Sequence, residues 1–220
     1  MIKGKDLTKI YWHEAGSYTV ATHNVSFEIR RGDFAIITGR SGCGKTTLLS
    51  MIGGLTKPTK GKVFVEGIDV WSLNDRELST FRNRKFGFIF QFPSLFPTLT
   101  VLENLLLPTL FSGLNEETYR HAFQLLKTVG LIEKYDAYPY QLSAGQQRRV
   151  AIARALINKP EIVLADEPTS DLDEDTEREI MELFKQINTD ATILLVTHNP
   201  ELSVYGNRHF RMSQGKLTEL

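Results

Sequence analysis

A short glycine-rich stretch, residues 39–47, constrains this chain more than any other part of its sequence. It reads GRSGCGKTT and matches the pattern G-x-x-x-x-G-K-[ST]. The apolar run over residues 34–38 before it is typical of a buried strand, and residues 46–52 are typical of a helix that stops at Gly53. A strand, a glycine-rich loop and a helix in this order form a phosphate cradle, because backbone N–H groups and the helix N-terminus point at one anion. The stretch therefore predicts an α/β fold that binds a nucleoside triphosphate.

The side chains of this loop indicate how the triphosphate is held. Lys45 can reach the β- and γ-phosphates, and the hydroxyl of Thr46 can bind Mg²⁺. The alternative is an ordinary strand-to-helix turn that binds nothing, and the strand and helix on either side of the loop favour the phosphate site. The predicted nucleotide-binding residues of the loop are Gly39, Arg40, Ser41, Gly42, Cys43, Gly44, Lys45, Thr46 and Thr47.

Length and charge limit the other classes of function. With 220 residues, the chain can form one large domain or a core domain with an inserted lobe. Its formal net charge is +0 and its pI is about 7.0, so no overall field attracts nucleic acid or an anionic membrane, and we expect no nucleic-acid partner. The single cysteine, Cys43, cannot form an intrachain disulfide, which fits a reducing compartment. No signal peptide or membrane span is evident, and we expect a soluble chain.

Two more apolar runs end in groups that can act on a phosphate. Asp166 and Glu167 follow residues 162–165, and His198 follows residues 192–197. Ligands of parallel sheets bind beyond the carboxyl ends of the strands, so we expect these groups to meet the glycine-rich loop. Asp166 can hold Mg²⁺, Glu167 can polarise the attacking water, and His198 can reach the γ-phosphate. Such a carboxylate pair is more often a cap or a surface pair, and a lone histidine is more often core, but their place beside the loop favours catalysis.

Residues 86–111 are unusually rich in phenylalanine. They hold six of the thirteen phenylalanines of the chain and are interrupted by Pro93, Pro97 and Pro108, which exclude a membrane helix. Some of these rings must be core. The density of apolar side chains nevertheless exceeds what a small lobe can bury, which indicates a docking site for another protein. Within this segment, Gln91 offers a neutral amide for Mg²⁺ or water.

Residues 115–158 are predicted to be largely helical, with a first helix over residues 116–129 that ends at Gly130. Ser143 with Gln146 forms the S-x-x-Q pattern of a capping box. One interpretation is a well-capped helix and nothing more. The other is that Ser143 and Gly145 offer a second helix N-terminus to the γ-phosphate. Near the start of the chain, Tyr11 and Trp12 precede a polar turn, where an aromatic ring either stacks on a base or, more often, packs in the core.

Across its whole length, the chain resembles the nucleotide-binding subunit of an ATP-binding cassette (ABC) transporter. Residues 142–146 (LSAGQ) resemble the LSGGQ signature of that family, and residues 164–168 resemble its Walker B motif. Gln91 resembles the Q-loop glutamine, residues 170–173 the D-loop, and His198 the switch histidine. Together with the glycine-rich loop, six motifs occur in the family's order. The resemblance also favours Tyr11 over Trp12 as the aromatic residue that stacks on the base.

The resemblance implies a complete set of expectations. The fold would be α/β, with a P-loop ATPase core containing a mixed, mainly parallel sheet, an N-terminal antiparallel β-subdomain and an inserted helical subdomain. Residues 1–220 would form a single domain, with residues 1–90 and 160–220 as its core and about 91–159 as the helical subdomain. The implied cofactors are ATP and Mg²⁺. Implied catalytic residues are Glu167, His198 and Lys45; implied metal ligands are Thr46, Gln91 and Asp166; implied further nucleotide contacts are Tyr11, Gln91, Ser143, Gly145 and Gln146.

The family mechanism would pair two subunits head to tail around ATP, so that Ser143 and Gly145 of one cap the γ-phosphate held by Lys45 of the other. A membrane permease would dock near residues 91–111, placing the chain in the cytoplasm, on the inner face of the membrane. Two residues depart from the family pattern: Ala144 replaces the first signature glycine, and Asp171 stands where the D-loop usually has a small or neutral residue. The methyl group of Ala144 is tolerable unless its φ is positive. The charge of Asp171 predicts somewhat weaker dimerisation.

Within the family, several local runs resemble the branch that serves lipoprotein release, macrolide or peptide export and cell-division complexes. These runs are residues 52–55, 87–91, 103–104 with Pro108, and 164–169. The main alternative is a soluble cassette ATPase of DNA repair or translation. Such proteins usually carry two cassettes, long coiled-coil insertions or basic patches, and none is evident here. A small-molecule kinase is a weaker alternative, because it needs neither the signature nor Glu167.

Overall fold

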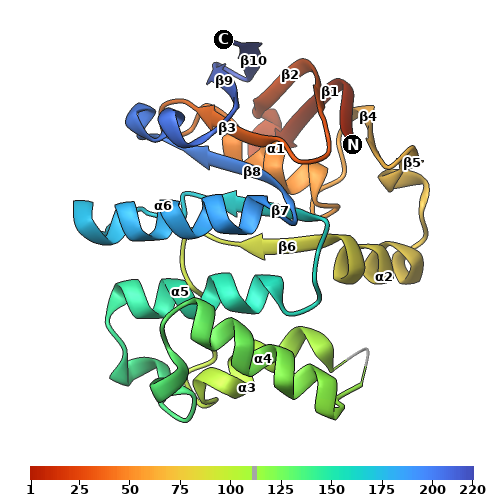
Figure 1. The fold of residues 1–220 in the computed structure, drawn as a ribbon. Helices are drawn as coiled ribbons and strands as arrows, with labels where there is room; N and C mark the ends of the chain where they lie inside the picture. The colour runs from red at the N-terminus through yellow and green to blue at the C-terminus, as the bar shows by residue number, and fades with distance from the viewer. Residues whose placement is uncertain (111–112) are drawn as a thin grey trace.

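The computed structural model describes residues 1–110 and 113–220 as two β-sheets with helices between and below them (Figure 1). The smaller sheet is antiparallel, in the order β2-β1-β4-β5, and consists of β1 (Ile2–Trp12), β2 (Tyr18–Ile29), β4 (Lys60–Val65) and β5 (Ile68–Asp69). The larger sheet, in the order β10-β9-β3-β8-β7-β6, consists of β3 (Phe34–Thr38), β6 (Phe86–Ile89), β7 (Ile162–Asp166), β8 (Thr192–Thr197), β9 (Arg208–Ser213) and β10 (Lys216–Glu219). The α-helices are α1 (Lys45–Ile52), α2 (Asp75–Lys85), α3 (Val101–Leu106), α4 (Glu116–Thr128), α5 (Ala144–Leu156) and α6 (Glu174–Asn188).

The larger sheet is buried on both faces. Its strands pair in parallel except β10, which pairs antiparallel with β9. Successive residues of its central strands belong to different cores: Ile36 and Val163 pack on one side, and Ile37 and Leu164 pack on the other. Because side chains of a strand alternate between faces, continuous apolar runs are what a doubly covered parallel sheet requires.

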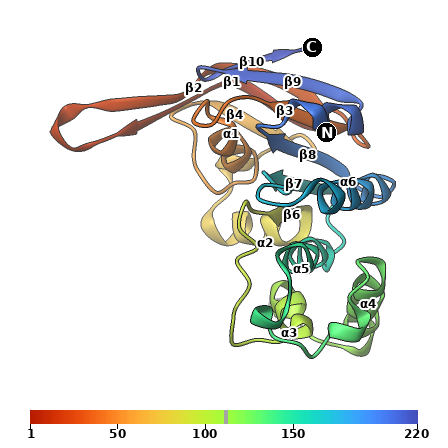
Figure 2. The same cartoon turned by 90° about the vertical axis from the view of Figure 1, so that its left-hand side faces the viewer.

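The core on one side of this sheet lies under the smaller sheet, with α1 between the two. Leu48 and Ile52 of α1 are fully buried there. Figure 2 shows that β1 and β2 continue past this core as a long hairpin that projects from the body of the molecule. Trp12 and Tyr18 pair at its far end, with ring centroids 5.3 Å apart, and both side chains are exposed. The hairpin thus places these two aromatic side chains outside the core, at the surface of the molecule.

The core on the opposite side is covered by α5 and α6, and α3 and α4 pack beneath α5 (Figures 1 and 2). We call α3, α4, α5 and the turns between them the helical lobe. It lies between β6 and β7 in the sequence. Arg154, near the end of α5, donates to the carbonyl oxygens of Pro93 (2.7 Å) and Ser94 (3.0 Å), which ties the segment after β6 to the lobe. The chain that leaves β6 is therefore attached to α5.

The expected α/β architecture is confirmed, with its mixed, mainly parallel sheet, its N-terminal antiparallel sheet and its helices between β6 and β7. The predicted end of the first helix at Gly130 is confirmed, and the chain from there to α5 is not α-helical. Gly130, with φ of 71°, ends α4, and only short 3-10 turns at Ile132–Lys134 and Pro139–Gln141 follow. Glycine leaves a helix at positive φ at little cost, and proline lacks the N–H group that an α-helix needs. The proposed domain boundaries stay a prediction.

Candidate functional site

Three neighbouring parallel strands of the larger sheet, β7, β8 and β3, end at the same edge. The glycine-rich loop follows β3, Asp166 is the last residue of β7, and His198 follows β8. A cavity of about 370 Å³ opens at this edge. It is lined by Thr19, Ala21, Ser41, Gly42, Gly44, Lys45, Thr46, Thr47, Gln91, Glu167 and His198. Residues from five separate parts of the sequence thus meet at this edge, and among them the loop, Glu167 and His198 lie where the strand pattern predicts them.

Two glycines of the loop lie in close contact with the backbone of other strands, which holds the loop in its shape. A Cβ on Gly44, whose φ is 108°, would collide with the carbonyl oxygen of Ala21 in β2, and a Cβ on Gly39 with that of Met212 in β9. The turn between β9 and β10 also binds the loop directly, because the N–H of Gly215 donates to the carbonyl oxygen of Cys43 at 3.1 Å. Glycine is needed at both loop positions, for close approach and, at Gly44, for positive φ.

Lys45 is buried at the base of this cavity, with 6% of its surface exposed. Its ammonium group donates to the carbonyl oxygens of Gly39 (2.7 Å) and Arg40 (3.3 Å), and it lies 3.3 Å from Oε1 of Glu167. These acceptors compensate the buried charge, which would otherwise cost several kcal/mol. A phosphate group bound by Lys45 would compete with Glu167 and with these carbonyl oxygens for the three N–H donors of the ammonium group.

Glu167 has a constrained position beside the cavity. Its φ of 46° is unusual for a residue other than glycine, and its N–H donates to the carbonyl oxygen of Val196 in β8 at 2.9 Å. Its Oε2 accepts from the backbone N–H of His198 (3.0 Å) and lies 2.9 Å from Nδ1 of that ring. One carboxylate oxygen is thus held by His198 and the other faces Lys45. This orientation suits a base that receives a proton from water in the cavity.

Asp166 and Thr46 form the part of the site that could hold a cation. The hydroxyl of Thr46 donates to Oδ1 of Asp166 at 3.1 Å. Burial raises the pKa of Asp166, although the Thr46 hydrogen bond and Lys45 act in the opposite direction. Among the described residues, Asp166 forms no ion pair. A cation bound beside this buried carboxylate would therefore stabilise its charged form. A carboxylate, a hydroxyl and the amide of Gln91, completed by phosphate and water oxygens, are the hard ligands that Mg²⁺ prefers.

The aromatic residues of the hairpin lie beside the cavity but do not line it. Tyr11 pairs across the ladder with Thr19, which lines the cavity, and Lys9 Nζ lies 5.1 Å from the centre of the Tyr11 ring. Trp12 pairs with Tyr18, one step farther out, and is 70% exposed. Neither ring is core, so the alternative of a buried aromatic residue is wrong here. The register places Tyr11 nearer to the loop than Trp12.

The signature residues lie in a different hollow. Ser143, Gly145 and Gln146 share it with Thr176 and Glu179 of α6, and it has no lining residue in common with the cavity at the loop. Ser143 and Gln146 form the predicted capping box: Gln146 N–H donates to Oγ of Ser143 (3.2 Å), and Ser143 N–H donates to Oε1 of Gln146 (3.0 Å).

Gly145 cannot easily be replaced in this hollow, because a Cβ there would lie 2.7 Å from Cγ2 of Thr176. Ala144 opens α5 and does not have positive φ, so its methyl group causes no backbone strain. Folding therefore does not bring the signature residues to the phosphate loop of the same chain.

The comparisons with known proteins agree with this geometry. The model of a family described as ABC transporter matches residues 22–170, which is more than half of the chain. The chain belongs to the ABC transporter family.

The matched segment of this ABC protein includes the phosphate loop, Gln91, the signature and Walker B. A lipoprotein-releasing system ATP-binding protein, LolD, of Aquifex aeolicus is 46% identical over 195 residues, covering 88% of this chain and 87% of LolD. A macrolide export ATP-binding/permease protein, MacB, of Rhodopirellula baltica is 41% identical over 213 residues, covering 92% of this chain but only 31% of MacB.

Among solved structures, the cassette MJ0796 of Methanocaldococcus jannaschii, a dimer bound to ADP and Pi, superposes with a TM-score of 0.92. It is 41% identical, and the match covers 100% of this chain and 98% of that one. The ABC cassette fold and the ATPase family of this chain are thereby shown, and the relatives agree with the lipoprotein-release and macrolide-export branch.

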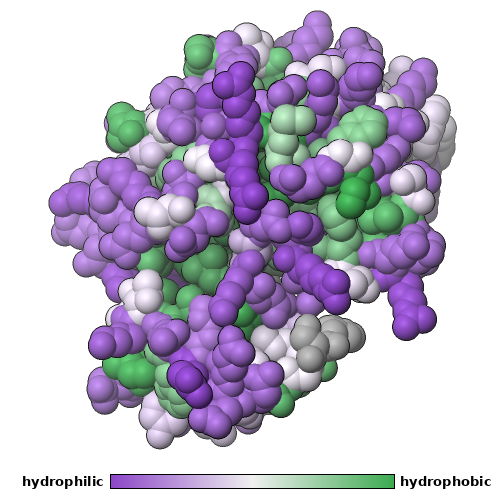
Figure 3. Space-filling view, turned by 45° about the vertical axis from the view of Figure 1, so that its right-hand side comes forward, coloured by the Kyte–Doolittle hydropathy of each residue, from purple (hydrophilic) through white to green (hydrophobic). Residues whose placement is uncertain are grey.

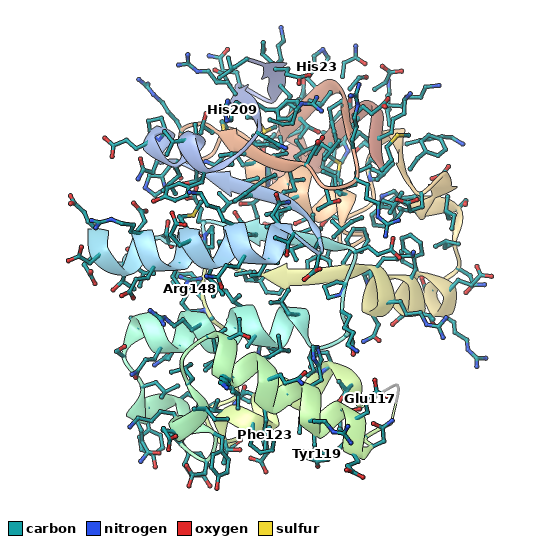
Figure 4. The ribbon with its side chains drawn as sticks, in the orientation of Figure 1. His23, Glu117, Tyr119, Phe123, Arg148 and His209 are labelled. Atoms are coloured by element: carbon teal, nitrogen blue, oxygen red, sulfur yellow. The ribbon has the colours of Figure 1, made fainter. Side chains whose placement is uncertain are left out.

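One residue near the cassette's site was missed by sequence reasoning. Arg148 of α5 is 4% exposed, and Figure 4 shows it on the side of the helix that faces the sheet. Its Nη1 donates to the carbonyl oxygen of Phe90 at 2.7 Å, immediately before Gln91, while its Nε is buried without a partner among the described residues. Burial lowers the pKa of Arg148, and Asp171 opposes this shift. The positive charge of Arg148 thus partly offsets the D-loop charge, and only its position two residues after the signature could have drawn attention to it.

Proposed function

We propose that this chain is the ATP-binding and ATP-hydrolysing subunit of an ABC transporter and energises a separate membrane permease of the lipoprotein-release or macrolide-export type. Its family, and the likeness to LolD, MacB and the dimeric cassette, support this function. The main structural support for this function is that the site is divided. Lys45, Glu167 and His198 line one cavity, whereas Ser143 and Gly145 line another.

A second copy can complete this divided site. In a head-to-tail pair, the N-terminus of α5 in one copy would face the phosphate loop of the other, and its partial positive charge would stabilise the γ-phosphate. Two ATP molecules would then lie between the two chains. The dimeric arrangement of MJ0796 supports such a pair, since that cassette was solved as a dimer with ADP and Pi.

The reaction follows from the contacts of the residues at the loop. ATP binding would draw Lys45 from Glu167 to the phosphates, which frees the carboxylate Oε1. Glu167 would then accept a proton from the attacking water, while His198 holds the other carboxylate oxygen. Thr46, Asp166 and Gln91 would hold Mg²⁺, whose charge stabilises the β- and γ-phosphate oxygens. Tyr11 would stack on the base, next to Thr19 at the edge of the cavity.

The permease would dock on the surface that includes residues 91–110. Large apolar side chains are exposed there, among them Phe92 (67%) and Phe96 (55%). The last residue of the predicted docking segment, Phe111, lies outside the described residues. In the part of the chain that the structure describes, no helix combines the length and the hydropathy needed to cross a bilayer. We place the subunit in the cytoplasm, at the inner face of the membrane that holds its permease. The alternative of a soluble ATPase in DNA repair or translation is not favoured by the named relatives.

The experiment that tests this proposal is size-exclusion chromatography of the Glu167→Gln variant with and without ATP. The substitution keeps the shape of the side chain and removes the base, so bound ATP should persist. We expect a monomer without ATP and a dimer with ATP. Lys45→Ala in the same background is the control and should remain monomeric with ATP. If Glu167→Gln binds ATP but forms no dimer, the head-to-tail arrangement is wrong.

A further inference from the structure

The far end of the hairpin formed by β1 and β2 exposes rings and hydroxyl groups rather than aliphatic side chains. The face of the molecule drawn in Figure 3 exposes hydrophobic side chains, in green, between the upper body and the lower lobe. The exposed residues at the far end of the hairpin that carry a ring or a hydroxyl group are Tyr11, Trp12, His13, Ser17, Tyr18 and Thr19. A nucleobase, which has an apolar face and a polar edge, is bound by groups of these two kinds.

These side chains are divided between the two faces of the hairpin. Trp12 and Tyr18 pair on one face, with ring centroids 5.3 Å apart. Tyr11 and Thr19 form the next pair of the ladder and lie on the opposite face, because successive side chains of a strand alternate. Thr19 also lines the cavity at the phosphate loop. The face that carries Tyr11 and Thr19 is therefore the one that a bound nucleotide meets.

Stacking on Tyr11 alone would hold a base without identifying it. Every base has a π-face, so an aromatic ring stacks on all of them. Lys9 Nζ lies 5.1 Å from the centre of the Tyr11 ring and donates to the carbonyl oxygen of Lys57 at 2.8 Å, which leaves the other side of the ring for a base. Bases differ in the donors and acceptors of their edges. Selection of one base therefore needs a hydrogen bond to its edge.

Thr19 places a hydroxyl group where it can form such a bond. Directly opposed residues of an antiparallel pair have Cβ atoms about 4.5–5.5 Å apart, so this hydroxyl lies within reach of the edge of a base stacked on Tyr11. Nε2 of His13 lies 2.8 Å from Oγ1 of Thr19. The backbone N–H of His13 donates to the carbonyl oxygen of Ser17 at 2.9 Å, which closes the tip of the hairpin. The His13 ring can thus set the direction in which the Thr19 hydroxyl points.

We propose that Thr19, oriented by His13, contacts the edge of the nucleobase and selects a base that carries an exocyclic amino group, as adenine does. This inference rests on the proposed function, in which the base lies on Tyr11, and adds what distinguishes one base from another. When Nε2 of a neutral His13 ring is the acceptor, the Thr19 hydroxyl donates its one hydrogen to the ring and offers only lone pairs to the ligand.

An amino group and a carbonyl oxygen respond to these lone pairs in opposite ways. The amino group of adenine donates to Oγ1 of Thr19. Guanine and hypoxanthine have a carbonyl oxygen at the same ring position, which would bring two acceptors together. A polar group left without a partner costs affinity, and a site that hydrogen-bonds its ligand therefore rejects the analogue that lacks the matching group. Because Thr19 is exposed, water lessens this cost, and we expect a moderate preference.

The test compares the binding of ADP with that of inosine diphosphate (IDP) to the full chain. The two ligands have the same ribose and phosphates and purine rings of the same size, but IDP has a carbonyl oxygen in place of the amino group. Neither carries the γ-phosphate on which the head-to-tail dimer depends. Competition with a fluorescent ADP analogue measures both affinities at equilibrium. We expect ADP to bind about threefold to tenfold more tightly than IDP, as one exposed hydrogen bond allows.

Three substitutions at exposed residues of the hairpin separate the contributions of the two side chains. Thr19→Val removes the hydroxyl and keeps the size of the side chain, so ADP and IDP should bind equally. His13→Phe keeps a ring but removes the acceptor, so the Thr19 hydroxyl can turn to suit either base and the preference should disappear while ADP still binds. Tyr18→Phe is the matched control, because it removes a hydroxyl from the neighbouring residue on the opposite face. It should retain the preference for ADP, and all three variants should keep the thermal unfolding midpoint.

Several results would overturn the inference. IDP could bind as tightly as ADP, or the preference could survive in Thr19→Val or in His13→Phe. Thr19→Val could also weaken both diphosphates by the same factor, which would place the hydroxyl on the ribose instead of the base.

The proposed function is judged separately by ATP-driven dimerisation of Glu167→Gln, which involves no choice between bases. A dimer without a base preference removes only the contact between Thr19 and the base edge. A base preference without a dimer keeps that contact and removes the head-to-tail arrangement.

Discussion

The phosphate loop and the signature differ in how far folding completes them. At the loop, Lys45, Glu167 and His198 come from three parts of the sequence and contact one another in a single cavity. At the signature, Ser143 and Gln146 bond to each other, and their hollow holds no group from the loop. The first region is assembled by the chain itself, whereas the second presents a capped helix N-terminus apart from the loop.

The reason for this difference is burial. The charges at the loop lie near the ends of buried strands, where they must be paired or hydrogen-bonded within the chain. The capping groups at the signature are exposed, so water can replace any partner at small cost. We infer that the loop determines whether ATP binds to one chain, and that the signature determines whether two chains associate. Predictions for each region can separate these roles.

The largest expected effect belongs to the loop. Glu167→Gln should lower the rate of ATP hydrolysis by a factor of about 10² to 10⁴, because a general base contributes about that much. ATP affinity should not fall, since the substitution also removes the ion pair that competes for Lys45. Phosphate release and equilibrium ATP binding measure the two effects. Glu182→Gln, at an exposed residue of α6 that pairs with Lys185, is the control and should hydrolyse ATP at the normal rate. Hydrolysis by Glu167→Gln within about threefold of normal would exclude Glu167 as the base.

A smaller effect is expected at the signature, where two substitutions separate capping from association. Ser143→Asp retains an N-cap acceptor, so the free energy of unfolding should change little, whereas Ser143→Ala should lose about 1 kcal/mol. In the Glu167→Gln background, Ser143→Asp should nevertheless abolish the ATP-dependent dimer, because its carboxylate would face the γ-phosphate of the other copy. Chemical denaturation and analytical ultracentrifugation measure the two properties. A dimer of normal stability in Ser143→Asp would show that the signature does not face the nucleotide.

The smallest effect is expected at Asp171, whose charge the sequence predicts to weaken the dimer. Arg148 partly offsets this charge, so Asp171→Ala should strengthen the ATP-dependent dimer by no more than about 1 kcal/mol. Arg148→Gln should weaken the dimer, and adding Asp171→Ala to it should restore more association than Asp171→Ala adds alone. Dimer dissociation constants of the four proteins form a double-mutant cycle. Additive effects would mean that Arg148 and Asp171 do not interact, and no change on Asp171→Ala would remove the idea of repulsion at the interface.

Much of the fold could be predicted because its signals are local. The apolar runs before the loop, before Asp166 and before His198 identify buried strands, and Ser143 with Gln146 marks the start of α5. The gap between α4 and α5 is also local in origin. Gly130, which the sequence predicts as the end of a helix, and Pro139 stop regular helix on either side of the gap. Breakers of this kind outweigh periodicity, since they change the backbone itself.

The sequence by itself determined the residue types of the nucleotide site and their order, because a phosphate loop, a strand-end carboxylate and a capping box each depend on neighbours a few positions away. Only the tertiary structure decided which of them meet. It paired Lys45 with Glu167 and directed the unpredicted Arg148 to the carbonyl oxygen before Gln91. These contacts join residues far apart in the chain. They depend on how helices and strands pack. A local sequence pattern does not tell which charged side chain of a distant element will lie next to a given residue.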